Sequence, residues 1–193
     1  MNVRRVLGLS SLSLALLLGG HALAVKPSSA TVTQQSSTLP DGAKTPAFEL
    51  VYESLVTISP PEDFGETAEG HRRVIPITGG TFQGPKISGT ILPRGADWNL
   101  SRRDGGSSVE ADYYLRTDDG VTIRIHNEGV AGEFTPPPPG PEGDETFFMY
   151  TIPRFEAPAT SRYGWMNRAV FIGTLQGRKG RTDAVLIRVF QLV

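Results

Sequence analysis

The chain has 193 residues, of which 38% are hydrophobic, and this is enough for one domain with one core. Its formal net charge of −1 at pH 7 indicates no basic surface for nucleic acid or for an anionic membrane, so we expect neither as a partner. Because the chain contains no cysteine, disulfide bonds and thiol catalysis are excluded, and the 22 glycines and 15 prolines indicate many turns.

The N-terminal segment, residues 1–24, has the pattern of a secretory signal peptide. Arg4-Arg5 form a positive segment, residues 6–18 form an apolar segment, and Ala22-Leu23-Ala24 supply the small residues that a signal peptidase reads. The apolar segment is shorter than the about 20 residues that cross a bilayer, so we expect cleavage after Ala24 and no stable membrane anchor. The sequence therefore predicts an exported protein, periplasmic or secreted. The arginine pair leaves the twin-arginine route open, although Leu7-Gly8 after the pair fits that route poorly.

A flexible leader is predicted over residues 25–45, which are rich in Ser, Thr and Gln and show no apolar period. Residues 46–193 are then predicted to form one domain. In residues 47–58 apolar and polar side chains alternate, as in a half-buried strand. Asp118-Asp119-Gly120 is a tight-turn signal between two further alternating runs, because Asp and Gly tolerate positive φ.

The remaining runs complete a chain of short strands separated by Gly and Pro. The strands are predicted at 47–58, 71–78, 86–92, 109–117, 121–128, 145–152, 168–175 and 183–192. After the signal segment, no window of twelve or more residues has a convincing helical period. We therefore predict an all-β fold, a single antiparallel β-barrel of about eight strands, with a sandwich as the alternative. The barrel is preferred because its closure removes exposed sheet edges.

A proline-rich loop, TPPPPGPEGDE at 135–145, lies between two predicted strands. Consecutive prolines favour an extended polyproline II segment that cannot join a sheet. One interpretation is a solvated surface loop, and the other is a semi-rigid flap over the mouth of the barrel, because long loops in compact domains often carry function.

Four spaced motifs resemble a known bacterial family. They are GGTFQGP at 79–85, followed by Gly89 and Pro93, GADW at 95–98, DDG at 118–120 and YGWMN at 163–167. Together they are similar to the family filed as domain of unknown function 3237, over 46–193. The resemblance implies a small antiparallel β-barrel and no particular activity. Two departures are a longer proline-rich loop and Met166 in a place where Leu is expected.

Several kinds of site are not indicated by the sequence. After residue 24 the chain has only His71 and His126, on different predicted strands, so no metal site is predicted. There is no G-x-S-x-G motif of a serine hydrolase and no dinucleotide fingerprint at Gly79-Gly80 and Gly84. We expect no cofactor.

Asp97-Trp98 is the first candidate pair, predicted to follow a glycine-containing turn at the end of a strand. A carboxylate beside a large apolar surface can have a raised pKa and act as a general acid or base, and the indole can stack on a planar ligand. The alternative is structural: Asp97 caps the turn and Trp98 fills the end of the barrel.

The strand at 109–117 carries the second candidate set. Alternation puts Glu110, Asp112, Tyr114 and Arg116 on one face and the apolar residues on the other. If the polar row faces inward, Asp112 is a second candidate base, Tyr114 lines the cavity and Arg116 can bind a carboxylate. If it faces outward, it is a solvated surface, and the pattern slightly favours this.

Tyr163, Trp165 and Asn167 form the third set, on one face by alternation. Aromatic rings beside an amide can line a site for planar polar molecules, and they also occur as ordinary core packing.

The sequence thus predicts a barrel that binds a small organic molecule, with Trp98, Tyr114 and Trp165 as walls. The first alternative is a cofactor-independent isomerase or lyase that uses Asp97 or Asp112 as base, with Tyr114 or Arg116 as electrophilic partner. The second is a structural or interaction protein with a solid core. The sequence does not decide between binding and catalysis, and it does not identify the ligand or the oligomeric state.

Overall fold

The computed structural model describes residues 45–132, 145–178 and 180–193. The predicted signal peptide 1–24, the leader 25–45 except Thr45, and the proline-rich loop 135–145 except Glu145 lie outside the described residues. No helix among the described residues is long and apolar enough to cross a membrane.

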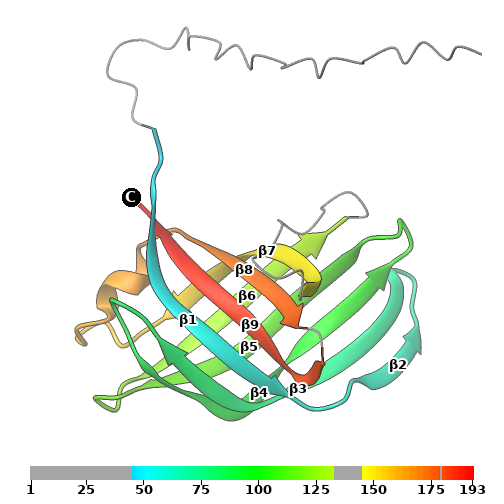
Figure 1. Cartoon of the computed structure of the whole chain (residues 1–193), viewed down its shortest axis with the longest axis horizontal. Coiled ribbons are helices and arrows are strands. Elements are labelled where there is room, and N and C mark those ends of the chain that lie inside the picture. Colours follow the sequence, from blue (N-terminus) through cyan, green and yellow to red (C-terminus); the bar gives the residue numbers. More distant parts are fainter. Residues whose placement is uncertain (1–44, 133–144, 179) are drawn as a thin grey trace, which may run out of the picture. The chain divides into compact units, whose positions relative to one another are not determined.

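The described chain is a succession of strands with one short 3₁₀ helix, η1 at Gly164–Asn167 (Figure 1). The strands are β1 Phe48–Ile58, β2 Glu62–Glu66, β3 Gly70–Gln83, β4 Gly89–Arg102, β5 Ser107–Thr117, β6 Thr122–Ala131, β7 Glu145–Glu156, β8 Phe171–Arg178 and β9 Arg181–Leu192.

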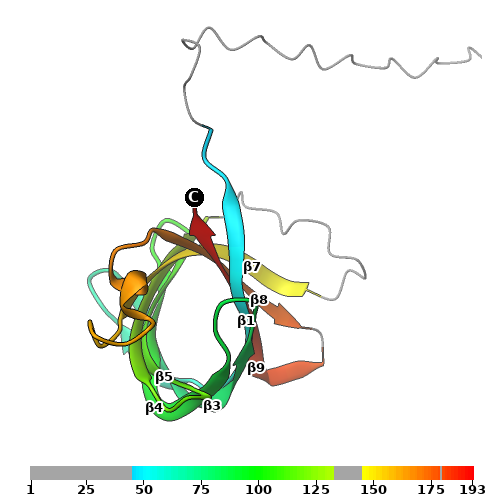
Figure 2. The ribbon, with the colours of Figure 1, turned by 90° about the vertical axis from the view of Figure 1, so that its left-hand side faces the viewer.

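The strands close into a barrel. Neighbours in the order β1-β9-β8-β7-β6-β5-β4-β3 pair antiparallel, and β1 pairs with β3 to complete the ring, which Figure 2 shows end-on. Strand β2 pairs only with β3 and lies outside the ring. The prediction of a single antiparallel barrel of about eight strands is confirmed, and β2 remains outside the closed ring as a short edge strand.

The predicted strand ends near Gly79-Gly80 and Pro93 were wrong, because the chain continues through both as strand. Strand β3 runs to Gln83 and β4 runs to Arg102, and each has a register shift at these points. Gly80 and Gly95 have φ of 133° and 110°, and a Cβ there would collide with the carbonyl oxygens of Leu55 and Asp112. These bulges bend two long strands enough for the sheet to close.

Aromatic rings fill the end of the barrel near η1. Phe171 lies 4.9 Å from Phe155 and 5.9 Å from Trp165, measured between ring centroids, and Tyr52 lies 5.3 Å from Phe82. We call this the η1 end. Strand β2 lies at the opposite end (Figure 1).

Candidate ligand-binding site

A cavity of about 330 Å³ lies inside the barrel at the end opposite η1, which we call the cavity end. All eight strands of the ring contribute to its walls. Most of the walls are aliphatic or aromatic, including Val56, Ile75, Ile77, Val109, Met149, Leu175 and Ile187. The cavity is therefore suited to an apolar molecular body.

Polar side chains also line the cavity. Besides Ser107 there are five, which we call the polar set: Arg73, Asp97, Asn99, Tyr113 and Asn127. They come from four consecutive strands of the ring, β3 to β6.

The strand register explains how the polar set is arranged. Asp97 on β4 pairs with Ala111 on β5, which pairs with Asn127 on β6. Asp97 and Asn127 thus flank the methyl group of Ala111. Their backbones are about 10 Å apart, which is the width of two strand spacings. Tyr113 lies two residues along β5 from Ala111, on the same face. The small side chain of Ala111 leaves room between the polar residues.

The carboxyl group of Asp97 has an unusual environment. Burial raises the pKa of Asp97 to about 6, while the hydrogen bonds from Glu110 N–H and Asn99 and the charge of Arg73 only partly offset that effect. The bond from Glu110 N to Asp97 Oδ1 is 2.9 Å long. Asp97 can therefore exchange a proton near neutral pH.

Tyr113 and Asn127 are almost completely buried, with 1% of each residue exposed. Within the described part of the chain, neither the Tyr113 hydroxyl nor the Asn127 amide atoms have a hydrogen-bond partner. Burial raises the pKa of the Tyr113 phenol, so this group remains a neutral donor. Buried polar atoms are normally paired, so these atoms are available to a molecule in the cavity.

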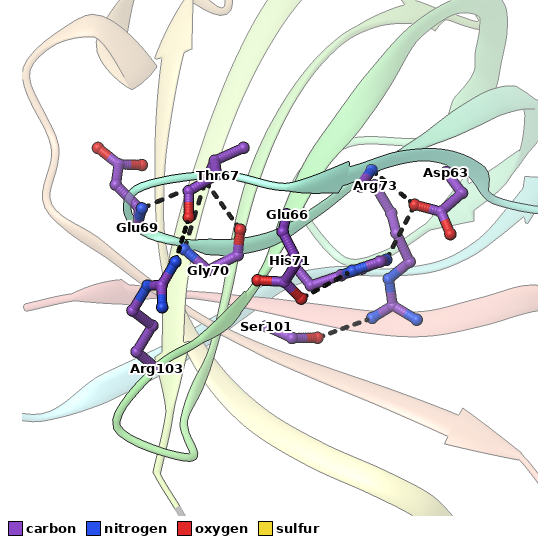
Figure 3. Close-up of polar contacts among 10 residues, drawn as sticks. Asp63, Glu66, Thr67, Glu69, Gly70, His71, Arg73, Ser101 and Arg103 are labelled. Carbon is purple, nitrogen blue, oxygen red and sulfur yellow. Dashed lines mark hydrogen bonds and ion pairs between the residues drawn. The ribbon is translucent and has the colours of Figure 1, made fainter.

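Arg73 and Asn99 extend the polar set toward the β2 side. Arg73 Nη2 donates to Asn99 Oδ1 at 2.7 Å and to Ser101 Oγ at 3.5 Å, and Asn99 Nδ2 donates to the carbonyl of Ser108 at 3.3 Å. Figure 3 shows Arg73 near Asp63 and His71, with its guanidinium group reaching toward Ser101. Asn99 therefore holds the guanidinium in place on the cavity wall.

Of the residues that the sequence analysis singled out, only Asp97 lines the cavity. It lies within β4 and not at the end of a strand after a turn, which corrects that expectation. Trp98 is 41% exposed, on the outer face of the same strand, so its ring does not form a cavity wall. Adjacent residues of a strand face opposite sides, and Asp97 takes the inner one.

The polar row of β5 faces outward, which decides the alternative left open by the pattern. Tyr114 and Arg116 are exposed, and Asp112 accepts hydrogen bonds from Arg124 and His126 on the outer surface. Burial alone would raise the pKa of Asp112, but its bonds to His126 and Arg124 lower it overall. Asp112, Tyr114 and Arg116 therefore do not line the cavity, and the prediction that they do is wrong.

Tyr163, Trp165 and Asn167 lie in and beside η1, not on a strand, and none of them lines the cavity. The Tyr163 hydroxyl donates to Asp119 Oδ1 at 3.0 Å. Asn167 bonds to the backbone N–H and carbonyl of Ala157 at 2.7 and 2.8 Å. These contacts fix the segment between β7 and β8, so the packing interpretation accounts for this set.

Four members of the polar set were not predicted from the sequence: Arg73, Asn99, Tyr113 and Asn127. One signal was available in the predicted strand 121–128, where Ile123, Ile125 and Asn127 share a face and an amide takes an apolar position. Arg73 lies in the predicted strand 71–78 and shares a face with Ile75 and Ile77, so the same signal was available there. Asn99 was hidden because the bulge of β4 was read as the end of a strand.

Neither of the two described histidines, His71 and His126, belongs to the cavity. His71 contacts Asp63 at 2.9 Å and Glu66 at 3.2 Å beside β2 (Figure 3). His126 contacts Asp112 and Glu128 on the outer face. Over the described ranges, no group of three or more His, Asp or Glu side chains is arranged to hold a metal ion.

Comparison with known proteins identifies relatives over almost the whole described domain. The family described as "Protein of unknown function (DUF3237)" matches residues 46–192. A UPF0311 protein of Rhodopseudomonas palustris (strain TIE-1) is 34% identical over 163 residues, covering 77% of this chain and 99% of that relative.

Solved structures share the barrel. A β-barrel-like protein from Acinetobacter baumannii AYE is 29% identical, with a TM-score of 0.65, covering 81% of this chain and 100% of that one. A structure described as an enzyme from Penicillium herquei is 18% identical, with a TM-score of 0.58, covering 80% of this chain and 100% of that one. The second similarity is one of fold alone.

Proposed function

Because the chain belongs to the DUF3237 family, whose description carries no activity, we propose from the cavity itself that this barrel binds a small organic molecule. The body of the molecule lies against the aliphatic walls, and its polar end meets the polar set. We also propose that binding takes place outside the cytoplasm, which rests on the signal-peptide pattern of residues 1–24.

The observation that carries this proposal is the buried hydrogen-bonding capacity of Tyr113 and Asn127. An unpaired buried amide or hydroxyl group costs about 1–3 kcal/mol of stability. Both groups line a cavity of about 330 Å³. A protein that keeps such groups beside an apolar cavity is suited to a ligand that satisfies them. The same cavity argues against a barrel with a solid core.

Proton transfer is the second candidate function, and one observation favours it. Asp97 has a pKa of about 6 and flanks Ala111 opposite Asn127. A base with this pKa can remove a proton from a bound molecule, and the Tyr113 hydroxyl and the Asn127 amide can donate to an oxygen that gains negative charge. This arrangement corresponds to a cofactor-independent isomerase or lyase, with Asp97 as the base.

A thermal-shift screen against small phenols, ketones, alcohols and carboxylic acids tests binding. A ligand at 100 times its dissociation constant should add about 2.7 kcal/mol of stability. Ala111→Leu fills the space between Asp97 and Asn127, so it should abolish the shift, whereas Tyr114→Phe on the outer face should preserve it. A shift that survives Ala111→Leu would place binding elsewhere.

Asp97→Asn separates binding from catalysis. For any compound that binds, the parent is assayed for turnover, and the variant is assayed for both binding and turnover. Retained binding with lost turnover identifies Asp97 as the base. Binding without turnover in the parent rejects the second candidate for that compound.

A further inference from the structure

Arg73 lies partly buried on the cavity wall, whereas the other described arginines without a carboxylate ion pair, such as Arg94, Arg103 and Arg116, are exposed to solvent. Among the described residues, ion pairs with carboxylates are made by Arg72, Arg102, Arg124, Arg154, Arg181 and Arg188. Arg73 makes none with a described carboxylate, and its hydrogen-bond partners are the neutral side chains of Asn99 and Ser101.

The Nε atom of Arg73 is buried and has no hydrogen-bond partner within the described residues. A guanidinium withdrawn from water is stabilised best by an anion, and an unpaired buried charge is costly. The carboxyl group of Asp97 lines the same cavity and the charge of Arg73 acts on it, but the two groups are not among the ion pairs of the described residues. The anionic partner of Arg73 is therefore to be sought among molecules that enter the cavity.

We propose that the ligand is a monocarboxylic acid with an apolar body, whose carboxylate pairs with Arg73 while the body lies against the aliphatic walls. This inference rests on the proposed binding function and names the chemical class of the ligand. A carboxylate matches the planar fork of a guanidinium and can accept two parallel hydrogen bonds from it. Asn99 orients that fork through the bond at 2.7 Å.

Asp97 is compatible with a carboxylate in the same cavity. The groups that act on it are the Glu110 N–H and side chain, Asn99 and the charge of Arg73. A second carboxylate nearby favours the protonated form of Asp97, because two like charges cannot both remain ionised at low cost. Protonated Asp97 can donate to the ligand carboxylate, so binding takes up a proton and weakens as the pH rises above about 6.

Isothermal titration of the purified chain with paired probes tests this inference. Octanoate and benzoate are compared with octanamide and benzamide, which have nearly the same shape and no charge. A charge-assisted hydrogen bond contributes about 1.5–3 kcal/mol, so the acids should bind the parent about 10- to 100-fold more tightly than the amides.

Two arginine variants locate the effect. Arg73→Met should remove the preference for the acids, and Arg73→Lys, which keeps the charge without the fork, should keep part of it. Arg72→Met is the matched control, because Arg72 is the neighbouring residue on the outer face and pairs with Glu69. It should leave the preference within about twofold of the parent, as expected for a residue without contact to the ligand.

The outcomes are distinct. Equal binding of acids and amides to the parent overturns the carboxylate inference and leaves the cavity-binding proposal intact, and so does a preference that survives Arg73→Met in a folded variant. Failure of all four probes, while another screened compound binds, also overturns only the inference. Failure of every compound in the screen overturns both.

Discussion

The two ends of the barrel follow the same alternation of inward and outward side chains but differ in what the inward positions hold. At the η1 end, aromatic rings such as Phe155 and Phe171 meet at 4.9 Å and fill the interior. At the cavity end, Ala111 occupies an inward position between Asp97 and Asn127, and a volume of about 330 Å³ remains. One end of the barrel is thus packed for stability, whereas the other keeps the cavity in which we propose that a ligand binds.

The largest effect is expected from truncating the packed end. Phe171 is 2% exposed, so Phe171→Ala should lower the free energy of unfolding by about 3–5 kcal/mol. Phe147 lines the cavity and is 42% exposed, so Phe147→Ala should lower it by about 1 kcal/mol. Urea unfolding of both variants measures the contrast, and equal losses would remove the distinction between the two ends.

The next largest effect is expected in the pH dependence of stability, which should differ between two aspartates on opposite sides of the barrel wall. Asp97 has a pKa raised from 3.8 to about 6 by burial, so folding binds a proton between these values and stability falls as the pH rises through this window. Asp97→Asn should therefore stabilise the protein by about 1–2 kcal/mol at pH 8, and this gain should shrink toward pH 4.

Replacing Asp112 should change the stability in the opposite direction. Burial would raise the pKa of Asp112, but His126 and Arg124 lower it overall. The ionised carboxylate therefore stabilises the fold at pH values above the ordinary carboxyl range, and this stabilisation is lost as the pH falls through the lowered pKa. Asp112→Asn should therefore destabilise the protein at neutral pH. Unfolding curves measured from pH 4 to pH 8 check both variants, and the same sign for both would contradict the assignment of inside and outside.

A smaller effect separates two buried amides of the polar set. Asn127→Leu removes an amide without a described partner and should raise stability by about 1 kcal/mol. Asn99→Leu breaks bonds to Arg73 and Ser108 and should lower stability by about 1–2 kcal/mol. Denaturant midpoints measure both changes, and a clear loss in Asn127→Leu would show that this amide is already satisfied.

The smallest effect concerns neighbouring tyrosines on β5. Tyr113→Phe removes a buried, unpaired hydroxyl and should leave stability unchanged or raise it by up to about 1 kcal/mol, while weakening any ligand that bonds to that hydroxyl. Tyr114→Phe on the outer face should change stability by less than about 0.5 kcal/mol and leave binding unchanged. The melting temperature with and without ligand measures both, and loss of binding in Tyr114→Phe alone would reverse the inferred faces.

The barrel could be predicted from the sequence because strand spacing and alternation are local properties. The bulges could not, because Gly79-Gly80 marks a turn and a bulge equally well until the partner strand is known. Only the register shows that a side chain at Gly80 would meet the carbonyl of Leu55.

The candidate site was predicted only at Asp97. On β5 the inward row is largely apolar and the outward row largely polar, but each row contains one tyrosine, Tyr113 inside and Tyr114 outside. Alternation therefore indicates which residues share a face, but the inner side depends on how the sheet curves. The grouping of Asp97 with Asn127 depends on pairing across two strand boundaries, which no local pattern contains.

The most direct test of the central claim is a methyl NMR titration of the labelled protein with a compound that gives a thermal shift. If the cavity binds it, the shifted signals should be those of Ile75, Ile77, Met149, Leu175 and Ile187, while the methyl groups of Leu115 and Ile123, which do not line the cavity, stay in place. Shifts confined to Leu115, Ile123 or the segment around η1, with none at the cavity residues, would contradict the account.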